Sequence, residues 1–310
     1  MMEWIKKGMF FNTDHNFDWM ISHACVPTVH VLNKNVFRIF FAPRNKKGQS
    51  ELTYVDVDSS NPKNILGYPE KPIMPLGKLG AFDDGGIMPC SVVPTKDGLY
   101  LYYVGWNPSG SVPYRNSIGL AVSKNNGESF HRMFEGPIVD RNPLEPYFTA
   151  SPYVMQENNI WHMWYASSTG FVKVNGKPEP LYIIKYASSE DGITWKRENL
   201  TCIKPKDKFE ANARASVIKE DGVYKMWFAY RGSFDFRNGK DSYRIGYAES
   251  WDAVNWERMD HKAGISFSEN GWDSKMQTYP NVIVHNSRKY LFYNGNGFGE
   301  TGIGYAVDKN

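Results

Sequence analysis

The sequence predicts an all-β protein, folded as a single five-bladed β-propeller domain over residues 1–310. Three observations predict this fold: the composition, a strand pattern that recurs about every 62 residues, and a first strand that fits the place missing from the last repeat. The chain contains 27 Gly and 18 Pro together with 10 Trp, 19 Tyr and 18 Phe. Such an aromatic-rich and turn-rich composition suits many short strands better than long helices.

The repeat is centred on a run of alternating aromatic and aliphatic residues, in which five aromatic positions are equivalent. These positions are Phe41, Tyr103, Tyr165, Phe228 and Tyr293, at spacings of 62, 62, 63 and 65 residues. A short strand precedes each run, and the five short strands begin at Pro27, Cys90, Pro152, Ala215 and Pro280. A third strand follows each run, and a turn then leads to a fourth. Four period-2 strands joined by turns are typical of a propeller blade.

The last copy of the repeat ends after its third strand, Ile303-Gly304-Tyr305-Ala306. We expect its fourth strand at the other end of the chain, where Trp4-Ile5-Lys6-Lys7 mirrors Trp195-Lys196-Arg197. A first strand that completes the last blade closes the ring and leaves no sheet edge unpaired. The aromatic runs are then expected to form the core between the blades.

Charge and composition argue against several classes of partner. The 36 Lys and Arg residues nearly balance the 33 Asp and Glu residues, so the net charge of +3 gives no sign of nucleic-acid binding. The three cysteines are far apart in sequence and predict neither a zinc site nor a disulfide framework. Because the sequence lacks both an apolar leader segment and an apolar stretch of about 18 residues, we expect a cytoplasmic protein without a membrane partner.

Carboxylates near the channel mouth are the candidate catalytic residues, because propeller function gathers in the loops where the innermost strands begin. Asp83, Glu145 and Asp273 stand seven positions before the short strands of their blades, and Glu210 stands five positions before its own. This recurrence also suits a structural role, since equivalent acids can cap equivalent turns. Asp84 breaks the repeat, and two adjacent carboxylates beside two glycines suit general acid–base chemistry at neutral pH.

Polar residues at inner-strand positions, where apolar residues would suffice, are candidate substrate-binding residues. They are His23, Ser151, Asn212, Arg214, Gln277 and Tyr279. The second-strand ends and one loop add Arg44, Trp106, Arg115, Arg231 and Asn294. Arginines beside aromatic and amide side chains suit a sugar that bears an acidic or phosphate group.

Two of these residues carry more specific expectations. Arg214 directly precedes a short strand, so its guanidinium is expected to be buried with an anionic partner, from the protein or from the substrate. His23 fits a structural role better than that of a base. Oxygen ligands such as Asp83, Asp84 and Glu210 could hold a cation in the channel, but no spacing signature supports a metal site, and we predict none.

Two blade motifs add a family resemblance. With five copies of the blade pattern, Ser-Ser-Glu-Asp-Gly-Ile-Thr-Trp at 188–195 and Tyr-Arg-Ile-Gly-Tyr-Ala-Glu-Ser at 243–250 resemble the five-bladed propeller glycosidases. That superfamily includes arabinanases and xylosidases, invertases, and mannoside phosphorylases. The resemblance covers essentially the whole chain in architecture. It implies glycoside chemistry at the channel mouth, with carboxylates as acid and base, a sugar or glycan as the partner, and no cofactor.

The chain also departs from that superfamily. The arabinanase and invertase branches carry an acidic triad at positions that correspond here to Val26, Pro89 and Ala150. Either the acids have moved or catalysis by this route has been lost, and the chain resembles a divergent member of the superfamily. The sequence around Asp83, Asp84 and Gly86 is more similar to the phosphorylase-type branch, or to an uncharacterised relative, in which the acids lie further from the strand.

We therefore expect an enzyme that cleaves or transfers a glycosyl unit, on a sugar that bears an anionic group. Asp84 is predicted as acid or base, with Asp83, Glu210 or Asp273 as its partner. Arg44, Arg214 and Arg231 are predicted to hold the anionic group. Three alternatives remain open: a non-catalytic carbohydrate-binding propeller, a glycoside phosphorylase or glycosyltransferase of the same fold, and a protein-interaction propeller. The sequence does not predict the oligomeric state.

Overall fold

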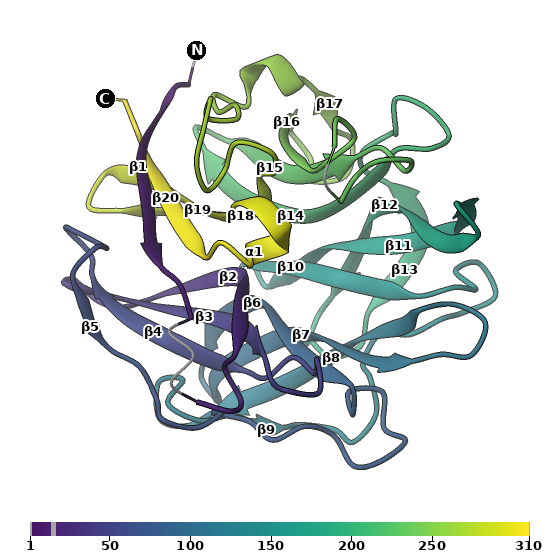
Figure 1. The fold of residues 1–310 in the computed structure, drawn as a ribbon, viewed down its shortest axis with the longest axis horizontal. Coiled ribbons are helices and arrows are strands. Elements are labelled where there is room, and N and C mark those ends of the chain that lie inside the picture. Colours follow the sequence, from purple (N-terminus) through teal and green to yellow (C-terminus); the bar gives the residue numbers. More distant parts are fainter. Residues whose placement is uncertain (1, 14–16, 238, 310) are drawn as a thin grey trace.

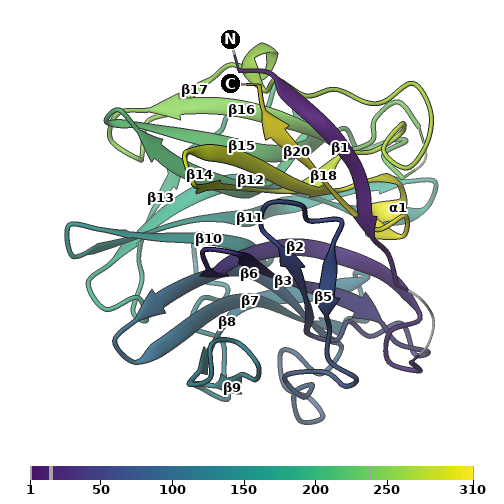
Figure 2. The same cartoon turned by 90° about the vertical axis from the view of Figure 1, so that its left-hand side faces the viewer.

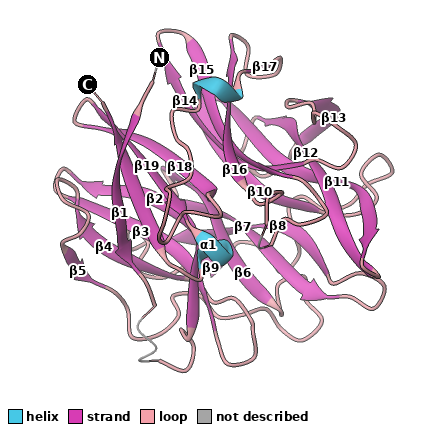
Figure 3. Cartoon of the chain, turned by 45° about the horizontal axis from the view of Figure 1, so that its top comes forward, coloured by secondary structure: helices cyan, strands magenta, loops and turns pink. Residues whose placement is uncertain are grey.

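The computed structural model describes residues 2–13, 17–237 and 239–309. They form five four-stranded antiparallel sheets, arranged as blades in a ring (Figure 1). Strands and loops make up nearly all of the chain (Figure 3). The predicted five-bladed β-propeller is confirmed.

The blades follow one another along the chain, and the first strand named in each blade is the innermost. Blade 1 contains β2 (Ser22–Asn33), β3 (Val36–Arg44), β4 (Thr53–Asp58) and β5 (Ile65–Gly67). Blade 2 contains β6 (Gly86–Thr95), β7 (Gly98–Pro108), β8 (Tyr114–Ser123) and β9 (His131–Arg132). Blade 3 contains β10 (Thr149–Glu157), β11 (Ile160–Val174), β12 (Lys177–Ser189) and β13 (Lys196–Thr201). Blade 4 contains β14 (Ala211–Glu220), β15 (Val223–Arg231), β16 (Arg244–Ser250) and β17 (Glu257–Arg258). Blade 5 contains β18 (Thr278–His285), β19 (Arg288–Asn294), β20 (Ile303–Asp308) and β1 (Trp4–Phe11). A 3-10 turn at Asp260–Lys262 and a single helical turn, α1 (Asn296–Gly299), lie in loops.

The ring closes through the first strand of the chain, as expected from the sequence. β1 pairs antiparallel with β20, in a register that places Trp4 opposite Asp308 and Ile5 opposite Val307. Figures 1 and 2 show the two ends of the chain side by side along this pair. The outer edge of the last blade is therefore covered by a strand from the other end of the chain.

The aromatic runs form the core between neighbouring blades, as predicted. All five equivalent aromatic residues of the repeat are fully buried. Phe37 of blade 1 packs edge-on against Tyr290 of blade 5, with 5.2 Å between ring centroids. Tyr102 of blade 2 donates a 2.8 Å hydrogen bond to the carbonyl of Gly192 in blade 3. Aromatic side chains thus hold each blade to the next.

A glycine in the third strand makes room for these aromatic rings. Gly119 lies opposite Tyr103 in the β7–β8 pair, and a Cβ at Gly119 would lie 2.3 Å from Cζ of that ring. Gly246 lies opposite Phe228 in the same way, with 2.6 Å between its hypothetical Cβ and the ring. The close approach of ring to backbone explains why the third strand repeatedly reads Ile-Gly. No helix of the described ranges is long and apolar enough to cross a membrane.

Candidate functional site

A cavity of about 460 Å³ lies where the inner strands of all five blades begin. Each blade contributes to its lining: Arg44 from β3, Trp106 from β7, Tyr182 from β12, Arg231 from β15 and Tyr279 from β18. Its volume is in the range of small-molecule sites, which are concave, mostly apolar and carry a few convergent polar groups. The ring therefore brings side chains from distant parts of the sequence to one hollow.

The backbone of the inner strands turns particular side chains toward the axis. Val26, Ser151, Arg214 and Tyr279 are equivalent residues of four blades, and all have φ between 48° and 59°. The pairing register of each of these inner strands shifts at this place, which is a β-bulge. Val26, Ser151 and Tyr279 line the cavity. The bulge, with its left-handed backbone, thus orients these side chains toward the axis of the propeller.

Positive charge dominates the cavity wall. Arg231 is 1% exposed, and its Nη2 donates to the carbonyl of Pro180 at 2.7 Å. Arg44 is exposed at the cavity edge, and no side chain in the described part of the protein forms an ion pair with it. Arg237 also lines the cavity. A wall with three guanidinium groups suits an anionic ligand, because planar guanidinium binds carboxylate and phosphate well.

Among the described residues that line the cavity, only Glu179 carries a carboxylate side chain. It lies in β12, is 4% exposed, and is held by Arg237 through two hydrogen bonds, one of which joins Nη2 to Oε2 at 2.9 Å. The ring of Phe236 packs against both Arg237 and Arg231, with guanidinium carbons 4.4 and 3.9 Å from its centroid. The loop after β15 therefore fixes the Glu179 carboxylate at the cavity wall. Within residues 2–13, 17–237 and 239–309, no three His, Cys, Asp or Glu side chains are arranged to hold a metal ion.

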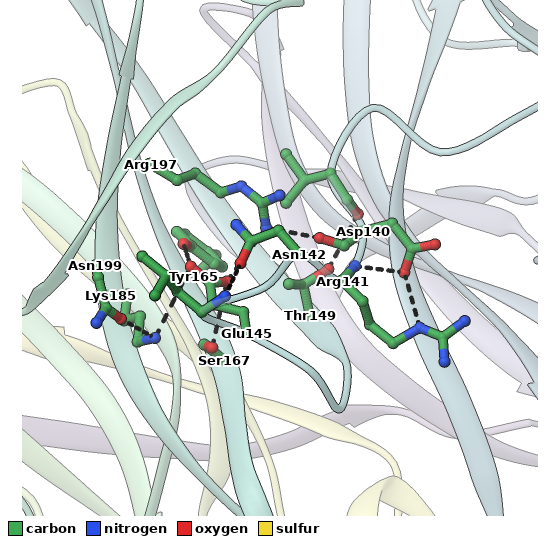
Figure 4. A network of polar contacts seen from close by, with 12 residues as sticks. Asp140, Arg141, Asn142, Glu145, Thr149, Tyr165, Ser167, Lys185, Arg197 and Asn199 are labelled. Carbon is green, nitrogen blue, oxygen red and sulfur yellow. Dashed lines mark hydrogen bonds and ion pairs between the residues drawn. The ribbon is translucent and has the colours of Figure 1, made fainter.

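The recurring carboxylates lie elsewhere, between the second and fourth strands of their blades. In blade 3, Glu145 accepts hydrogen bonds from Tyr165 of β11 at 2.8 Å and from Arg197 of β13 at 3.2 Å (Figure 4). Lys185, at the place of the third-strand glycine, lies 3.8 Å from the same carboxylate. We call this arrangement the strand clamp. It recurs as Asp83 with Tyr103 and Arg132, and as Asp273 with Tyr293 and Lys6.

Blade 4 has a reduced strand clamp. Glu210 is held by Arg258 of β17, while Phe228 stands where the other blades have a tyrosine that donates a hydrogen bond. Asp84 belongs to a loop, where one carboxylate oxygen accepts a 2.8 Å hydrogen bond from the backbone of Gly80. None of the four predicted catalytic residues, Asp83, Asp84, Glu210 and Asp273, lines the cavity. Their catalytic role stays a prediction, and each has structural partners.

The predicted binding residues divide into two groups. Five line the cavity: Arg44, Trp106, Ser151, Arg231 and Tyr279. Six do not: His23, Arg115, Asn212, Arg214, Gln277 and Asn294. Gln277 donates to the strand-clamp carboxylate of Asp273 at 2.9 Å, and Asn294 joins blade 5 to the backbone of Ala24 and Val26 in blade 1.

Two residues of the second group lie close to the cavity. Burial, and then the nearby charge of Arg44, lowers the pKa of His23 to about 4, so this imidazole is neutral at pH 7. Arg214 is fully buried, as expected, and its partners are the carbonyls of Cys90 and Pro27 and the hydroxyl of Thr28, with no acidic side chain of the described residues paired to it. Carbonyl oxygens of two other blades accept hydrogen bonds from its two terminal nitrogens, because this guanidinium reaches across the channel. Its Nε is buried without a hydrogen-bond partner among the described residues, and burial lowers the pKa of the guanidinium.

Sequence reasoning missed Glu179, Tyr182, Phe236, Arg237 and Tyr243. These residues lie in or beside the connections between second and third strands, which differ in length between the blades. The β11–β12 hairpin is the longest example, with strands of 15 and 13 residues. The extra length was visible as a wider gap between the second and third strands of blade 3, but no motif marked which residue would reach the cavity.

Comparisons with known proteins extend this description. No protein-family model matches the chain. It is 36% identical, over 310 residues and the full length of both proteins, to the Uncharacterized protein MT1551 of Mycobacterium tuberculosis strain CDC 1551 and likewise to the Uncharacterized protein Rv1502 of strain H37Rv.

Solved structures show the same fold. The chain superimposes on a structure named "Glycoside hydrolase" with a TM-score of 0.73 at 18% identity, over 98% of this chain and 91% of the other. A thermostable family-43 glycoside hydrolase gives a TM-score of 0.65 at 15% identity, over 96% and 91%. A third structure comes from work on the GH130 family of mannoside phosphorylases and gives 0.68 at 15% identity, over 99% and 93%. The predicted resemblance to five-bladed propeller glycosidases is thereby confirmed for the fold.

Proposed function

This protein belongs to the same family as the M. tuberculosis proteins MT1551 and Rv1502, and we propose that it is a glycosidase-like enzyme that cleaves or transfers a glycosyl unit on a sugar bearing an anionic group. The observation that carries the proposal is the cavity at the propeller axis, which combines three arginines, one carboxylate and several aromatic rings. The glycoside hydrolases and phosphorylases among the fold neighbours support it by analogy.

The composition of the cavity wall supports a sugar as the ligand. Apolar ring faces such as those of Trp106 and Phe148 suit the C–H faces of a pyranose, while amide, hydroxyl and guanidinium groups suit its oxygens. The indole Nε1 of Trp106 donates a 2.6 Å hydrogen bond to Ser50, which fixes the ring at the wall. The positive wall adds a preference for a sugar with a carboxylate or phosphate group.

Glu179 is the residue that we assign to proton exchange with the reacting oxygen atoms. It is buried at the wall, and its carboxylate is oriented by two hydrogen bonds from Arg237. A fixed carboxylate can accept the proton of an attacking water molecule while the water oxygen bonds to the anomeric carbon and the glycosidic C–O bond breaks. The departing oxygen then takes a proton from solvent. A general acid–base group of this kind contributes about 10²–10⁴-fold to a rate.

The test is turnover of nitrophenyl glycosides by the wild type, by Glu179→Gln and by Asp84→Asn. The panel contains a neutral glycoside, a glucuronide and a glucoside 6-phosphate, each with and without inorganic phosphate, so that hydrolysis and phosphorolysis are both detected. We expect wild-type release of nitrophenol from a charged substrate and a loss of about 10²–10⁴-fold in Glu179→Gln. If Asp84→Asn loses turnover while Glu179→Gln keeps the wild-type rate, the assignment to Glu179 is wrong and Asp84 is the catalytic residue.

A second function, a non-catalytic carbohydrate-binding propeller, is favoured by one observation. Glycoside hydrolysis ordinarily uses two carboxylic groups that flank the bond, and the described cavity lining contains only Glu179. Calorimetry with the corresponding free sugars distinguishes the two functions: binding without turnover supports the binding protein. If these sugars are neither bound nor turned over, both functions are wrong.

A further inference from the structure

Four tyrosines line the cavity, and each comes from a different blade. Tyr114 lies in β8, Tyr182 in β12, Tyr243 just before β16, and Tyr279 in β18. Tyr182 is close enough to the other three to interact with each of them electrostatically. Blade 1 contributes Arg44, which interacts with Tyr279. The ring thus gathers four phenols and a guanidinium around one volume.

A count of hydrogen bonds shows that these phenols have more O–H donors than acceptors in the described protein. The hydroxyls of Tyr182 and Tyr243 bond to each other, and Nε of Arg231 donates to both oxygens at 3.2 Å. Each phenol carries one proton, so this pair uses one proton internally and keeps a second. The hydroxyls of Tyr114 and Tyr279 have no hydrogen-bond partner in the part of the chain that the structure describes. Three O–H donors therefore lack an acceptor in the described protein.

Tyr114, Tyr243 and Tyr279 remain protonated donors at neutral pH. Burial is the largest cause that raises the pKa of Tyr114, Tyr243 and Tyr279 above that of an ordinary tyrosine. The Glu179 carboxylate at the wall accepts two hydrogen bonds from Arg237, and within the described residues none of the four cavity phenols donates to it. The cavity consequently offers donors and positive charge in excess of acceptors.

We infer that the hydroxyls of Tyr114, Tyr279 and the Tyr182–Tyr243 pair bind the oxyanion of the substrate, a phosphate or carboxylate group, and so determine its selection; this rests on the proposed function. An oxyanion only accepts hydrogen bonds, which matches three donors without acceptors. A neutral sugar hydroxyl can accept hydrogen bonds, but it also brings a donor of its own that would need a further acceptor at the wall, whereas an ionised carboxylate brings none. Arg44 and Arg231 supply the opposite charge beside the same phenols.

Calorimetry tests this inference with glucose 6-phosphate, glucuronate and glucose as probes. The proteins are the wild type, Tyr114→Phe, Tyr279→Phe and the double variant. Because neither hydroxyl has a partner in the described protein, its removal leaves the protein's own hydrogen bonds intact and stability within about 0.5 kcal/mol. Each substitution is expected to weaken binding of the preferred charged sugar about tenfold, since hydrogen bonds to charged groups are the strong ones, and to leave glucose binding unchanged.

The control variant is Tyr103→Phe, which removes a tyrosine hydroxyl from a strand clamp, not from the cavity. It is expected to lower stability without changing the affinity for any of the three sugars. If the wild type binds none of them, the proposed function fails and this inference falls with it. If the wild type prefers a charged sugar and the double variant keeps that preference, or loses glucose binding equally, only the inference is overturned. Whichever of glucose 6-phosphate and glucuronate binds more tightly identifies the oxyanion.

Discussion

Asp83→Asn distinguishes a structural carboxylate from a catalytic one. Asp83 is fully buried and accepts hydrogen bonds from Tyr103 at 3.0 Å and from Nε of Arg132 at 2.7 Å. The substitution removes the negative charge and keeps nearly the same shape. It therefore leaves the Arg132 guanidinium, whose side chain is 15% exposed, without its counter-ion.

The size of the effect follows from this burial. Removal of one partner from a buried ion pair costs about 3–5 kcal/mol, because the other charge stays desolvated. Arg132 keeps a second hydrogen bond, from Nη2 to the carbonyl of Pro75 at 2.8 Å, so we expect the lower end, about 3 kcal/mol. The matched control is Lys78→Ala, because the Lys78–Glu135 pair has side chains that are 82% and 75% exposed. Loss of an exposed pair changes stability by about 0–1 kcal/mol.

Urea unfolding, followed by tryptophan fluorescence and by circular dichroism, measures both variants. Coincident transitions by the two probes are the condition for deriving a free energy from the midpoint. Equal stability losses in Asp83→Asn and Lys78→Ala would refute the reasoning that the strand clamp holds the blade. Loss of turnover in Asp83→Asn at unchanged stability would instead support the catalytic role predicted from the sequence.

Two further predictions concern the same blades. Burial alone would raise the pKa of Asp273, but hydrogen bonds from Lys6, Ser268, Gln277 and Tyr293 outweigh the effect of burial and lower that pKa. The ionised carboxylate therefore stabilises the folded state at pH 7, and this stabilisation is lost as the pH falls below roughly 4. Asp273→Asn should accordingly be less stable than the wild type at pH 7, with a gap in urea midpoint that narrows toward pH 3, and a gap that widens would contradict the assigned interactions. Gly119→Ala places a Cβ 2.3 Å from the ring of Tyr103 and should lower the free energy of unfolding, measured by heat or urea, by about 1–3 kcal/mol. The control is Gly110→Ala, which has no atom within 4 Å of the new Cβ and should change the free energy of unfolding by no more than about 0.5 kcal/mol.

The sequence was sufficient to predict the fold because the fold depends on a repeated requirement. Every blade must bury an aromatic run against its neighbour, so Tyr103, Tyr165 and their equivalents recur at a fixed period. Ring closure was equally predictable, since a fourth strand was missing at one end and a matching strand began the other. That matching strand carries Lys6, which reaches the Asp273 carboxylate as Arg197 reaches Glu145.

The candidate site was only partly predictable. A search for the repeat identifies residues that occur at equivalent positions in every blade, whereas the cavity also depends on residues that occur in one blade only. The second-strand ends led correctly to the region that contains Arg44, Trp106 and Arg231. The search for recurring acids led instead to the strand clamps, because an acid that recurs in several blades has the same structural role in each of them. That search could not find Glu179, because Glu179 lies in the long β11–β12 hairpin and no local pattern marks which residue of the hairpin reaches the cavity.

The bulge in the inner strands reconciles a repeated fold with a unique site. A left-handed backbone at a non-glycine residue costs energy, of order 1–3 kcal/mol, and a β-branched residue such as Val26, at φ 59°, is among the least suited to it. Strain that recurs in four blades, despite side chains as different as those of Ser151, Arg214 and Tyr279, must be imposed by the shared backbone path rather than by any one side chain. The scaffold thus fixes where a side chain meets the axis and leaves its chemistry open. Neighbouring loops of unequal length then add the charged groups, and this division explains why a cavity with one carboxylate and three arginines can occupy a ring of nearly equal blades.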